Sequence, residues 1–383
     1  MKVALVHEWL TTLAGSERVF EALIEMYPDA DLFCVVDFLG LKDRGLLKGK
    51  TPQTTFIQHL PFARKRFRNY LPLMPIAIEQ LDLSGYDLIL SSHHAVAKGV
   101  ITGPDQLHLS YVHSPMRYAF DLQHQYLRES GLDRGLMSLI TRAILHRLRL
   151  WDVIASNRVD HFVANSSFIR RRIFRCYRRE AEVIHPPVRI HAFDSMRPKE
   201  DFYLTASRMV PYKRMDLIVE AFSRTPQRKL VVIGDGPEMK KIRKAQKPNI
   251  ELLGYQPDSV LKDHLERARA FVFAAEEDFG ILPVEAQAAG TPVIAFGKGG
   301  VLDTVIPLDD ARGRAPTGMF FEDQSAESLR RAIDVFEKNE TAFSASAIRS
   351  HAQNFSEERF KRAFTAFVDQ KLKAFRDKLP SDA

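Results

Sequence analysis

Two glutamates in the second half of the chain, Glu277 and Glu285, flank a glycine-containing turn with seven residues between them. The apolar run at residues 271–275 predicts a buried strand before the turn, and the composition after it predicts a helix. The turn therefore lies at the carboxyl end of a strand, where open α/β sheets bind ligands. Both carboxylates can accept hydrogen bonds from hydroxyl groups, such as those of a sugar and a ribose.

The backbone of this turn is a candidate phosphate site. The amide N–H groups around Gly280, Ile281 and Leu282 open the predicted helix and have no partners within it. Such groups can bind a phosphate without a side-chain cation. An acidic, solvated loop before an ordinary helix is the alternative interpretation.

A second loop supplies two cations, Arg208 and Lys213, between a predicted strand at 202–206 and a predicted helix at 215–222. An arginine fork and a lysine point charge on one loop suit a leaving diphosphate, which accumulates negative charge. Two surface charges are the alternative. A D-x-D triplet, which could hold a metal ion, occurs at residues 29–31, but it lies where a predicted helix ends. We therefore expect Arg208 and Lys213, rather than a metal, to stabilise the charge.

His113 follows a predicted strand at 108–112 and could donate to a sugar hydroxyl or stand beside developing charge. A structural histidine is the commoner alternative. His93 and His94 end another predicted strand and could line the same region. In the aromatic segment that follows His113, Tyr118 and Asp121 are candidate contacts for an acceptor.

Basic and large apolar residues are interleaved between residues 55 and 83, as in segments that lie in a membrane interface. A helix packed on its own sheet with a solvated basic face is the alternative. The candidate contacts to membrane or acceptor here are Arg64, Lys65, Arg66, Phe67 and Arg68. A second run, residues 170–179, has six arginines in ten and could contact the same membrane, a pyrophosphate or water. No recognised nucleic-acid-binding pattern accompanies these runs, so nucleic acid is not expected as a partner.

Strand and helix patterns alternate along the chain, which predicts parallel sheets. Further strands are predicted in the first half at 2–6, 31–36, 55–57, 86–91 and 161–164, and a helix at 17–26. Gly15 and Ser16 precede that helix, where a glycine lets a ligand approach the backbone and Ser16 could alternatively be the N-cap. Later strands at 229–233 and 250–253 lead to Gly234, Asp235 and Tyr255, and a lone G-x-G is weak evidence for nucleotide binding.

The composition is that of an ordinary globular chain of two domains: 383 residues, 45% of them hydrophobic, with a formal net charge of +7. Two cysteines predict a reducing compartment and no disulfide framework. The N-terminal stretch reads as a strand rather than a signal peptide, and no apolar run reaches membrane-spanning length.

The string E-x-F-G-I-x-P-x-E-A-x-A-x-G-x-P-V-I-A, which begins at Glu277, resembles the signature of retaining glycosyltransferases of family 4. These enzymes have the GT-B fold, with two Rossmann-like α/β domains facing across a cleft. The resemblance extends to Arg208 and Lys213, although Ser207 stands where a glycine is usual, and to the loop at Gly15, which keeps one of two common glycines. It implies a nucleotide-sugar site made by Gly15, Ser16, Arg208, Lys213, Gly234, Asp235, Tyr255, Glu277, Phe279, Gly280, Ile281, Leu282 and Glu285.

The same resemblance implies roles. Arg208 and Lys213 would stabilise the leaving diphosphate, Glu277 would orient the donor sugar, Glu285 would accept from the ribose, and His113 would contact the sugar. The leaving phosphate would act as the base in a retaining transfer that needs no metal or other cofactor.

The segments AGSER and YVHSPMRY most resemble bacterial O-antigen and exopolysaccharide mannosyltransferases. GDP-mannose is the donor implied first, and a UDP-hexose second. The acceptor would be a polyprenyl-diphosphate-linked saccharide, which places the enzyme in the cytoplasm, peripheral on the anionic inner face of the plasma membrane.

We expect an acceptor-binding, membrane-facing domain at 1–190, a nucleotide-sugar domain at 191–355 and a C-terminal helix at 356–383 that packs on the first domain. Two kinds of rival remain. One is another enzyme of this architecture, such as an epimerase or a phosphorylase. The other is a non-enzymatic protein that binds membranes or polyanions.

Overall fold

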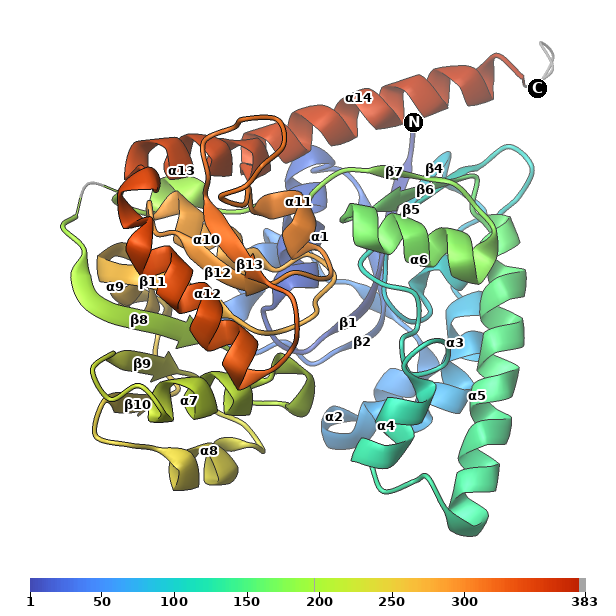
Figure 1. Ribbon diagram of the computed structural model, residues 1–383. Helices are drawn as coiled ribbons and strands as arrows, with labels where there is room; N and C mark the ends of the chain where they lie inside the picture. The colour runs from blue at the N-terminus through green and yellow to red at the C-terminus, as the bar shows by residue number, and fades with distance from the viewer. Residues whose placement is uncertain (196, 379–383) are drawn as a thin grey trace. The chain divides into compact units, whose positions relative to one another are not determined.

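The computed structural model describes residues 1–195 and 197–378. They form two compact units: Met1–Pro187 with the chain from Phe360 onward, and Val188–Arg359. The sequence predicts boundaries after residues 190 and 355, and the structure divides the chain after Pro187 and after Arg359. Each unit has its own parallel β-sheet flanked by helices (Figure 1).

The first unit is built on a seven-stranded parallel sheet in the order β3-β2-β1-β4-β5-β6-β7. Its strands are β1 (Val3–Leu10), β2 (Asp31–Asp37), β3 (Gln53–Thr54), β4 (Leu88–His93), β5 (Leu107–Val112), β6 (His161–Ala164) and β7 (Ala181–Val183). Its helices are α1 (Gly15–Met26), α2 (Ala63–Arg66), α3 (Met74–Glu79), α4 (Gln123–Glu129), α5 (Gly135–Ala155), α6 (Ser167–Tyr177) and most of α14 (Glu357–Arg376).

Alternation along the central strand separates two cores. Val3 and Leu5 of β1 pack with α1 and α14, whereas Ala4 and Val6 pack in the cluster that contains α3 and α5. This follows from the two-residue period of a strand, whose successive side chains point to opposite faces. Because both faces are covered, the strand is apolar throughout its first half.

Two local predictions in the first unit are wrong. Residues 55–57 are not a strand, because the Thr55 side chain accepts a hydrogen bond from the amide of Ile57 (3.3 Å) and begins a short 3₁₀ helix, Phe56–His59. Ser16 is not an N-cap. Helix α1 has Ala14 as its N-cap, and the carboxylate of Glu17 reaches back to accept from the Ala14 amide (3.0 Å).

The second unit contains a six-stranded parallel sheet in the order β10-β9-β8-β11-β12-β13. Its strands are β8 (Glu200–Ala206), β9 (Leu230–Ile233), β10 (Ile250–Gly254), β11 (Ala268–Phe273), β12 (Val293–Phe296) and β13 (Gly318–Phe321). Its helices are α7 (Met215–Ser223), α8 (Met239–Ala245), α9 (Asp258–Arg267), α10 (Ile281–Ala288), α11 (Val301–Thr304), α12 (Ala326–Lys338) and α13 (Ala345–Ala352).

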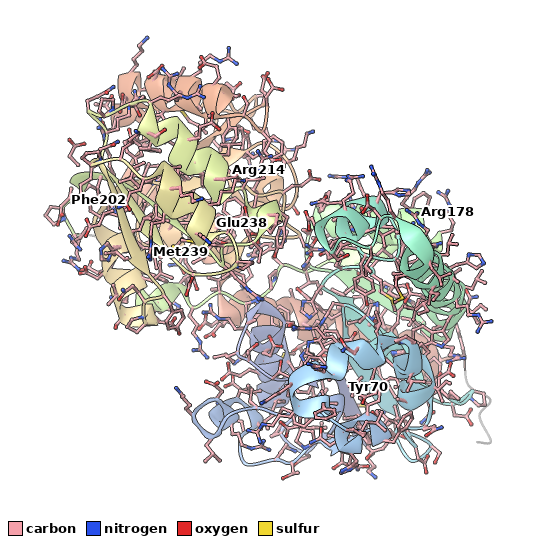
Figure 2. All side chains as sticks on the ribbon, turned by 90° about the horizontal axis from the view of Figure 1, so that it is seen from below. Tyr70, Arg178, Phe202, Arg214, Glu238 and Met239 are labelled. Carbon is pink, nitrogen blue, oxygen red and sulfur yellow. The ribbon has the colours of Figure 1, made fainter. Side chains whose placement is uncertain are left out.

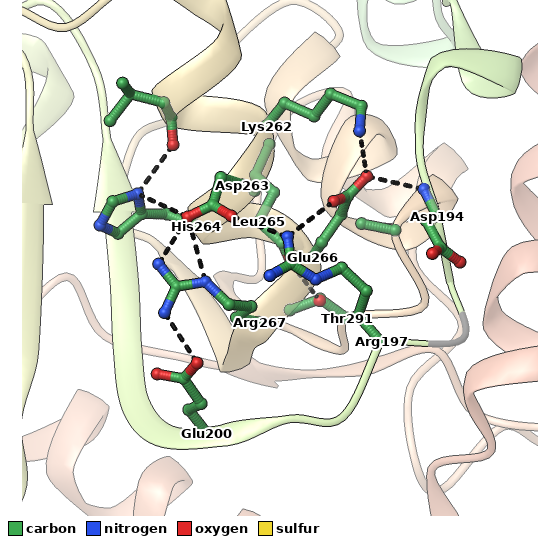
Figure 3. Close-up of polar contacts among 12 residues, drawn as sticks. Asp194, Arg197, Glu200, Lys262, Asp263, His264, Leu265, Glu266, Arg267 and Thr291 are labelled. Carbon is green, nitrogen blue, oxygen red and sulfur yellow. Dashed lines mark hydrogen bonds and ion pairs between the residues drawn. The ribbon is translucent and has the colours of Figure 1, made fainter.

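A polar network on α9 holds the segment that enters this second sheet (Figure 3). Glu266 accepts hydrogen bonds from the Asp194 amide (2.7 Å) and from Lys262 (2.6 Å), while Arg197 donates to Asp263 (2.7 Å). Arg267 donates to Glu200 at the start of β8 (2.8 Å). The network therefore fixes where β8 begins, and β8 leads directly to the loop that carries Arg208.

The predicted fold class is confirmed, since each unit is a Rossmann-like layer of parallel strands between helices. The last helix packs on the first unit as expected, through Phe360, Phe364, Phe367 and Val368. The end predicted for this helix, residue 383, lies outside the described residues. No helix among the described residues is both long and apolar enough to span a membrane.

Candidate functional site

The acidic turn of the second unit lies where the sequence places it, between β11 and α10. Gly280 is the N-cap of α10, with φ 86°, a left-handed conformation that glycine adopts without strain. Behind the turn, the Gly300 amide donates to the Glu277 carbonyl (2.8 Å). A Cβ on Gly300 would lie 2.3 Å from the Asp278 carbonyl oxygen, so glycine is required for this close approach.

The structure brings Lys213 and Glu277 together. The Lys213 ammonium donates to the Glu277 carboxylate, and both side chains are less than a fifth exposed. Gln324 ties the same loop to the end of β11, because it accepts from the Arg214 guanidinium (2.9 Å) and donates to the Ala274 carbonyl (2.8 Å). The predicted phosphate-binding lysine and sugar-binding glutamate thus form one pair at the strand ends.

Glu285 lies on the second turn of α10, as predicted, and is only 7% exposed. The side chain of Phe279, which the sequence places in the nucleotide-sugar site, is buried in the core, where its ring packs at 5.9 Å from that of Phe355. Any contact of Phe279 to a ligand would have to come from its backbone. The Ile281 and Leu282 amides stand in the first turn of α10, in the position expected for phosphate binding.

Arg208 lies on a loop that packs against the Gly234–Gly236 turn. The Met209 amide donates to the Asp235 carbonyl (2.9 Å), and a Cβ on Gly234 would lie 1.9 Å from the Ser207 carbonyl oxygen. The two glycines are therefore required by the contact between these loops. The Arg208 side chain is exposed, and its guanidinium has no hydrogen bond or ion pair with any residue in the described part of the chain. It is available for an anionic ligand.

Beside this turn lies a pocket of about 460 Å³, lined by Gly236, Pro237, Met239, Lys240, Arg243 and Lys244. Glu238 and Met239 mark its neighbourhood in Figure 2. Asp235 is exposed, and its carboxylate accepts from the Gly236 amide (2.7 Å). Tyr255, which follows β10, is also exposed and could stack on a base.

In the first unit, His113 follows β5 and is held by hydrogen bonds. Its Nε2 is 2.8 Å from the Ser92 hydroxyl, and its amide donates to the His93 carbonyl (2.8 Å). Burial, together with the charges of His94 and His7, holds the pKa of His113 well below its usual value. His113 is therefore a neutral imidazole, suited to hydrogen bonding with a hydroxyl rather than to pairing with a charge.

A buried carboxylate beside His113 was missed from the sequence. Glu8, near the end of β1, accepts from the amides of four consecutive residues at the end of β4, His94 to Ala97, at 2.7–3.0 Å. The His93 ring also approaches it at 3.2 Å. Burial favours a raised pKa for Glu8, but these hydrogen bonds and the charges of His93 and His94 outweigh it and lower the pKa well below its usual value.

Further polar side chains surround this carboxylate. His7 lies 3.6 Å from Glu17 and stacks on Phe20 with a ring separation of 4.6 Å. Burial lowers the pKa of His94 to about 4, so this ring is neutral as well. The Ser16 hydroxyl donates to Glu17 (2.9 Å), so the predicted Gly15–Ser16 loop lies beside the Glu17 carboxylate. The neutral imidazoles of His94 and His113, which follow β4 and β5, can bind hydroxyl groups.

The basic–aromatic segment between residues 61 and 74 is only partly available for contacts. Arg64, Lys65, Arg66 and Arg68 are exposed, as predicted. Phe67 is not a membrane or acceptor contact, because it is 6% exposed and packs against Trp9, with ring centroids 5.3 Å apart. Tyr70, which donates to the Pro61 carbonyl (2.6 Å), marks this segment in Figure 2.

The two residues predicted to contact an acceptor, Tyr118 and Asp121, differ in their exposure. The Tyr118 hydroxyl is buried. Asp121 is exposed but accepts from Arg172 (2.5 Å), which also donates to Ser114 (3.1 Å). Arg172 is thus a buried link between α6 and the end of β5, although it belongs to the arginine run that the sequence assigns to a surface. Among the described residues, no group of His, Cys, Asp or Glu is arranged to hold a metal ion.

Residues 189–361 match the family model described as glycosyl transferases group 1. This part of the chain is a glycosyl transferases group 1 domain. It coincides closely with the second unit and contains Arg208, Lys213 and both glutamates of the acidic turn.

The proteins similar to this chain in sequence are distant relatives. An alpha-1,3/1,6-mannosyltransferase ALG2 from Kluyveromyces lactis is 22% identical over 268 residues, covering 55% of this chain and 53% of that protein. A GDP-mannose-dependent monoacylated alpha-(1-6)-phosphatidylinositol monomannoside mannosyltransferase from Corynebacterium glutamicum is 29% identical over 142 residues, covering 33% of this chain and 35% of that protein. The chain thus spans about half the length of the first of these relatives.

The overall fold is similar to that of Anabaena Alr3699/HepE, whose structure was determined in complex with UDP. The similarity covers 97% of this chain and 100% of that chain, with a TM-score of 0.68 and 17% sequence identity. Two parallel-sheet units, one of them a group 1 domain, make this the GT-B fold.

Proposed function

We propose that the protein is a retaining, metal-independent hexosyltransferase of family 4 that moves mannose from GDP-mannose to a lipid-linked saccharide. The observation that carries the proposal is the Lys213–Glu277 pair at the start of the acidic turn. A lysine for the diphosphate and a carboxylate for the sugar hydroxyls are adjacent there. The exposed Arg208 lies on the same loop as Lys213.

The proposed chemistry depends on stabilising the leaving nucleoside diphosphate. Arg208 and Lys213 would take up its negative charge, with the first amides of α10 as further donors. Lys213 would then exchange its contact with Glu277 for a phosphate oxygen, which frees the Glu277 carboxylate to orient the sugar. Glu285 would accept from the ribose, and the neutral His113 is the first unit's candidate contact to a sugar hydroxyl.

The donor is inferred from sequence similarity. Mannosyltransferases stand among the relatives, and one of them is described as dependent on GDP-mannose. A UDP-hexose is the second candidate, favoured by the similarity in fold to a protein crystallised with UDP. The acceptor, a polyprenyl-diphosphate-linked saccharide, would bring the enzyme to the inner face of the plasma membrane, where it would work in polysaccharide synthesis.

Product analysis tests this proposal. The purified chain would be incubated with GDP-mannose or UDP-glucose and an undecaprenyl-diphosphate-linked saccharide, with and without EDTA. We expect GDP release and a lipid product one hexose heavier by mass spectrometry, with the donor's anomeric configuration retained and no effect of EDTA.

Three results would contradict the proposal. A sugar nucleotide whose configuration changes without transfer would indicate an epimerase. Cleavage that requires inorganic phosphate would indicate a phosphorylase. A chain that turns over neither donor, and whose vesicle binding is unaffected by Glu277→Ala, would support the non-enzymatic alternative.

A further inference from the structure

Helix α5 exposes large apolar side chains along almost its whole length. Five leucines and isoleucines on it are between 44% and 72% exposed: Leu136, Leu139, Ile140, Leu150 and Ile154. At about 100° per residue these positions fall within an arc of roughly 100° around the helix axis, so they share one face of the helix. From Leu136 to Ile154 this face is about 27 Å long. We call it the α5 outer face.

The opposite side of the helix is ordinary core. Leu145 and Leu148 are buried against the sheet, and Trp151 donates to Glu79 of α3 (2.9 Å). The helix therefore runs along the edge of the first unit, with α3 on its inner side (Figure 1). Burial of that inner side fixes the helix, so the exposed residues are held on a rigid surface rather than on a loop.

The charged residues that α5 and α6 themselves expose are all basic. The single acidic residue of α5, Asp152, is fully buried, where it pairs with Lys98 and accepts from Tyr177 (2.7 Å). Arg147 is exposed on the outer face itself. No acidic residue occurs in α6, which packs against the C-terminal end of α5 and exposes Arg170, Arg171, Phe174, Arg175 and, just beyond its end, Arg178 (Figure 2).

This combination of apolar residues and cations distinguishes between the partners that could bind the α5 outer face. A second copy of the chain would bring arginines against arginines across an isologous contact, which is repulsive. Nucleic acid offers no counterpart for a row of leucines and isoleucines. An anionic bilayer satisfies both features, because its acyl boundary accepts apolar side chains and its headgroups attract cations.

We propose that the α5 outer face docks in the interface of an anionic lipid bilayer, with α5 parallel to the membrane plane and the α6 arginines on the headgroups. The inference rests on the proposed function, because docking would bring the enzyme to its lipid-linked acceptor. It places the membrane contact on a surface other than residues 64–68, since Phe67 of that segment is buried in the core.

Vesicle co-sedimentation of the full chain tests the proposal without any sugar donor. Vesicles of phosphatidylcholine alone would be compared with vesicles containing about one quarter phosphatidylglycerol. Leu139→Gln with Ile154→Gln removes two apolar contacts, and Leu41→Gln with Val335→Gln is a matched control, since these residues are exposed and lie outside α5. A third variant, Arg147→Gln with Arg178→Gln, removes two charges.

We expect the wild type to bind the anionic vesicles, and less so at high salt. The α5 variant should bind on the order of ten-fold or more weakly, and the control variant should bind as the wild type does. The affinity of the arginine variant for anionic vesicles should fall roughly ten- to thirty-fold, and its affinity for phosphatidylcholine vesicles should change little.

Three results would overturn the proposal: no binding of the wild type to anionic vesicles, equal loss in the α5 and control variants, or a dimer in gel filtration that the α5 variant converts to a monomer. The last would make a second copy the occupant. Thermal shifts with nucleoside diphosphates, measured on the same variants, test the proposed function independently of membrane binding. A protein that binds nucleotide but no vesicles would contradict the membrane proposal and leave the proposed function intact.

Discussion

Replacing Arg208 by alanine should lower the rate of sugar transfer by on the order of 10²–10³-fold while leaving the unfolding temperature unchanged. The guanidinium is exposed and makes no hydrogen bond or ion pair in the described part of the chain, so its loss removes nothing from the folded state. Its proposed contact is to the leaving diphosphate, where charge grows as the bond breaks. Steady-state kinetics with saturating donor, together with calorimetry, would measure both quantities.

Two matched variants make this result specific. Arg331→Ala removes another exposed arginine, on α12, and should leave turnover unchanged. Lys213→Ala should lower turnover by a similar factor, and Lys213→Arg should restore part of it, because the positive charge is kept without the same geometry. An Arg208→Ala enzyme with wild-type turnover would remove that residue from the diphosphate site.

Replacing Glu8 by alanine should destabilise the first unit by about 3–5 kcal/mol, as for other buried charged groups that lose their partners. The substitution leaves four consecutive amides, those of residues 94–97, without their shared acceptor and leaves a cavity beside His93. Denaturant unfolding followed by circular dichroism would measure the loss. Glu182→Gln, at an exposed carboxylate on β7, is the control and should change little.

The acid dependence of stability provides a second readout for Glu8. Its pKa is lowered on folding, so the ionised form contributes stability in full above its ordinary pKa of 4.5, and the contribution is lost as the pH falls below that value. The pKa of His94 is also lowered, to about 4, and its contribution begins to be lost earlier, below its ordinary pKa of 6.5.

A Glu8→Gln variant should therefore keep the loss of stability that begins near pH 6.5 and lose less stability than the wild type below about pH 4.5. If it unfolds with the same acid dependence as the wild type, Glu8 is not held ionised by its neighbours.

The sequence predicts well those features that depend on neighbouring residues. Short apolar runs locate β1, β5, β6 and β8 to β11 within a few residues, and the acidic turn with Gly280 stands where the motif requires. The strand predicted at 55–57 fails because one threonine side chain caps a 3₁₀ turn. Strand β7 goes unpredicted because its three residues, one of them a glutamate, carry no apolar pattern.

Features that depend on distant residues could not be predicted. Glu8 reads as a polar interruption of a strand until the backbone amides that donate to it, more than eighty residues away, are brought beside it. Gly234 resembles part of a dinucleotide motif, whereas its required contact is with the backbone of Ser207. Apolar residues occur on both sides of α5, and only packing shows which of them face outward.

The most direct test of the central claim is the unfolding temperature of the chain with GDP, GDP-mannose, UDP and UDP-glucose, with and without EDTA. A ligand that binds only the folded state raises this temperature, and the rise grows with the logarithm of the ratio of ligand concentration to Kd. We predict stabilisation by a nucleoside diphosphate, largest for GDP and GDP-mannose, unchanged by EDTA and weakened in Arg208→Ala. If no nucleotide shifts the midpoint at millimolar concentration, the assignment as a nucleotide-sugar-dependent transferase is wrong.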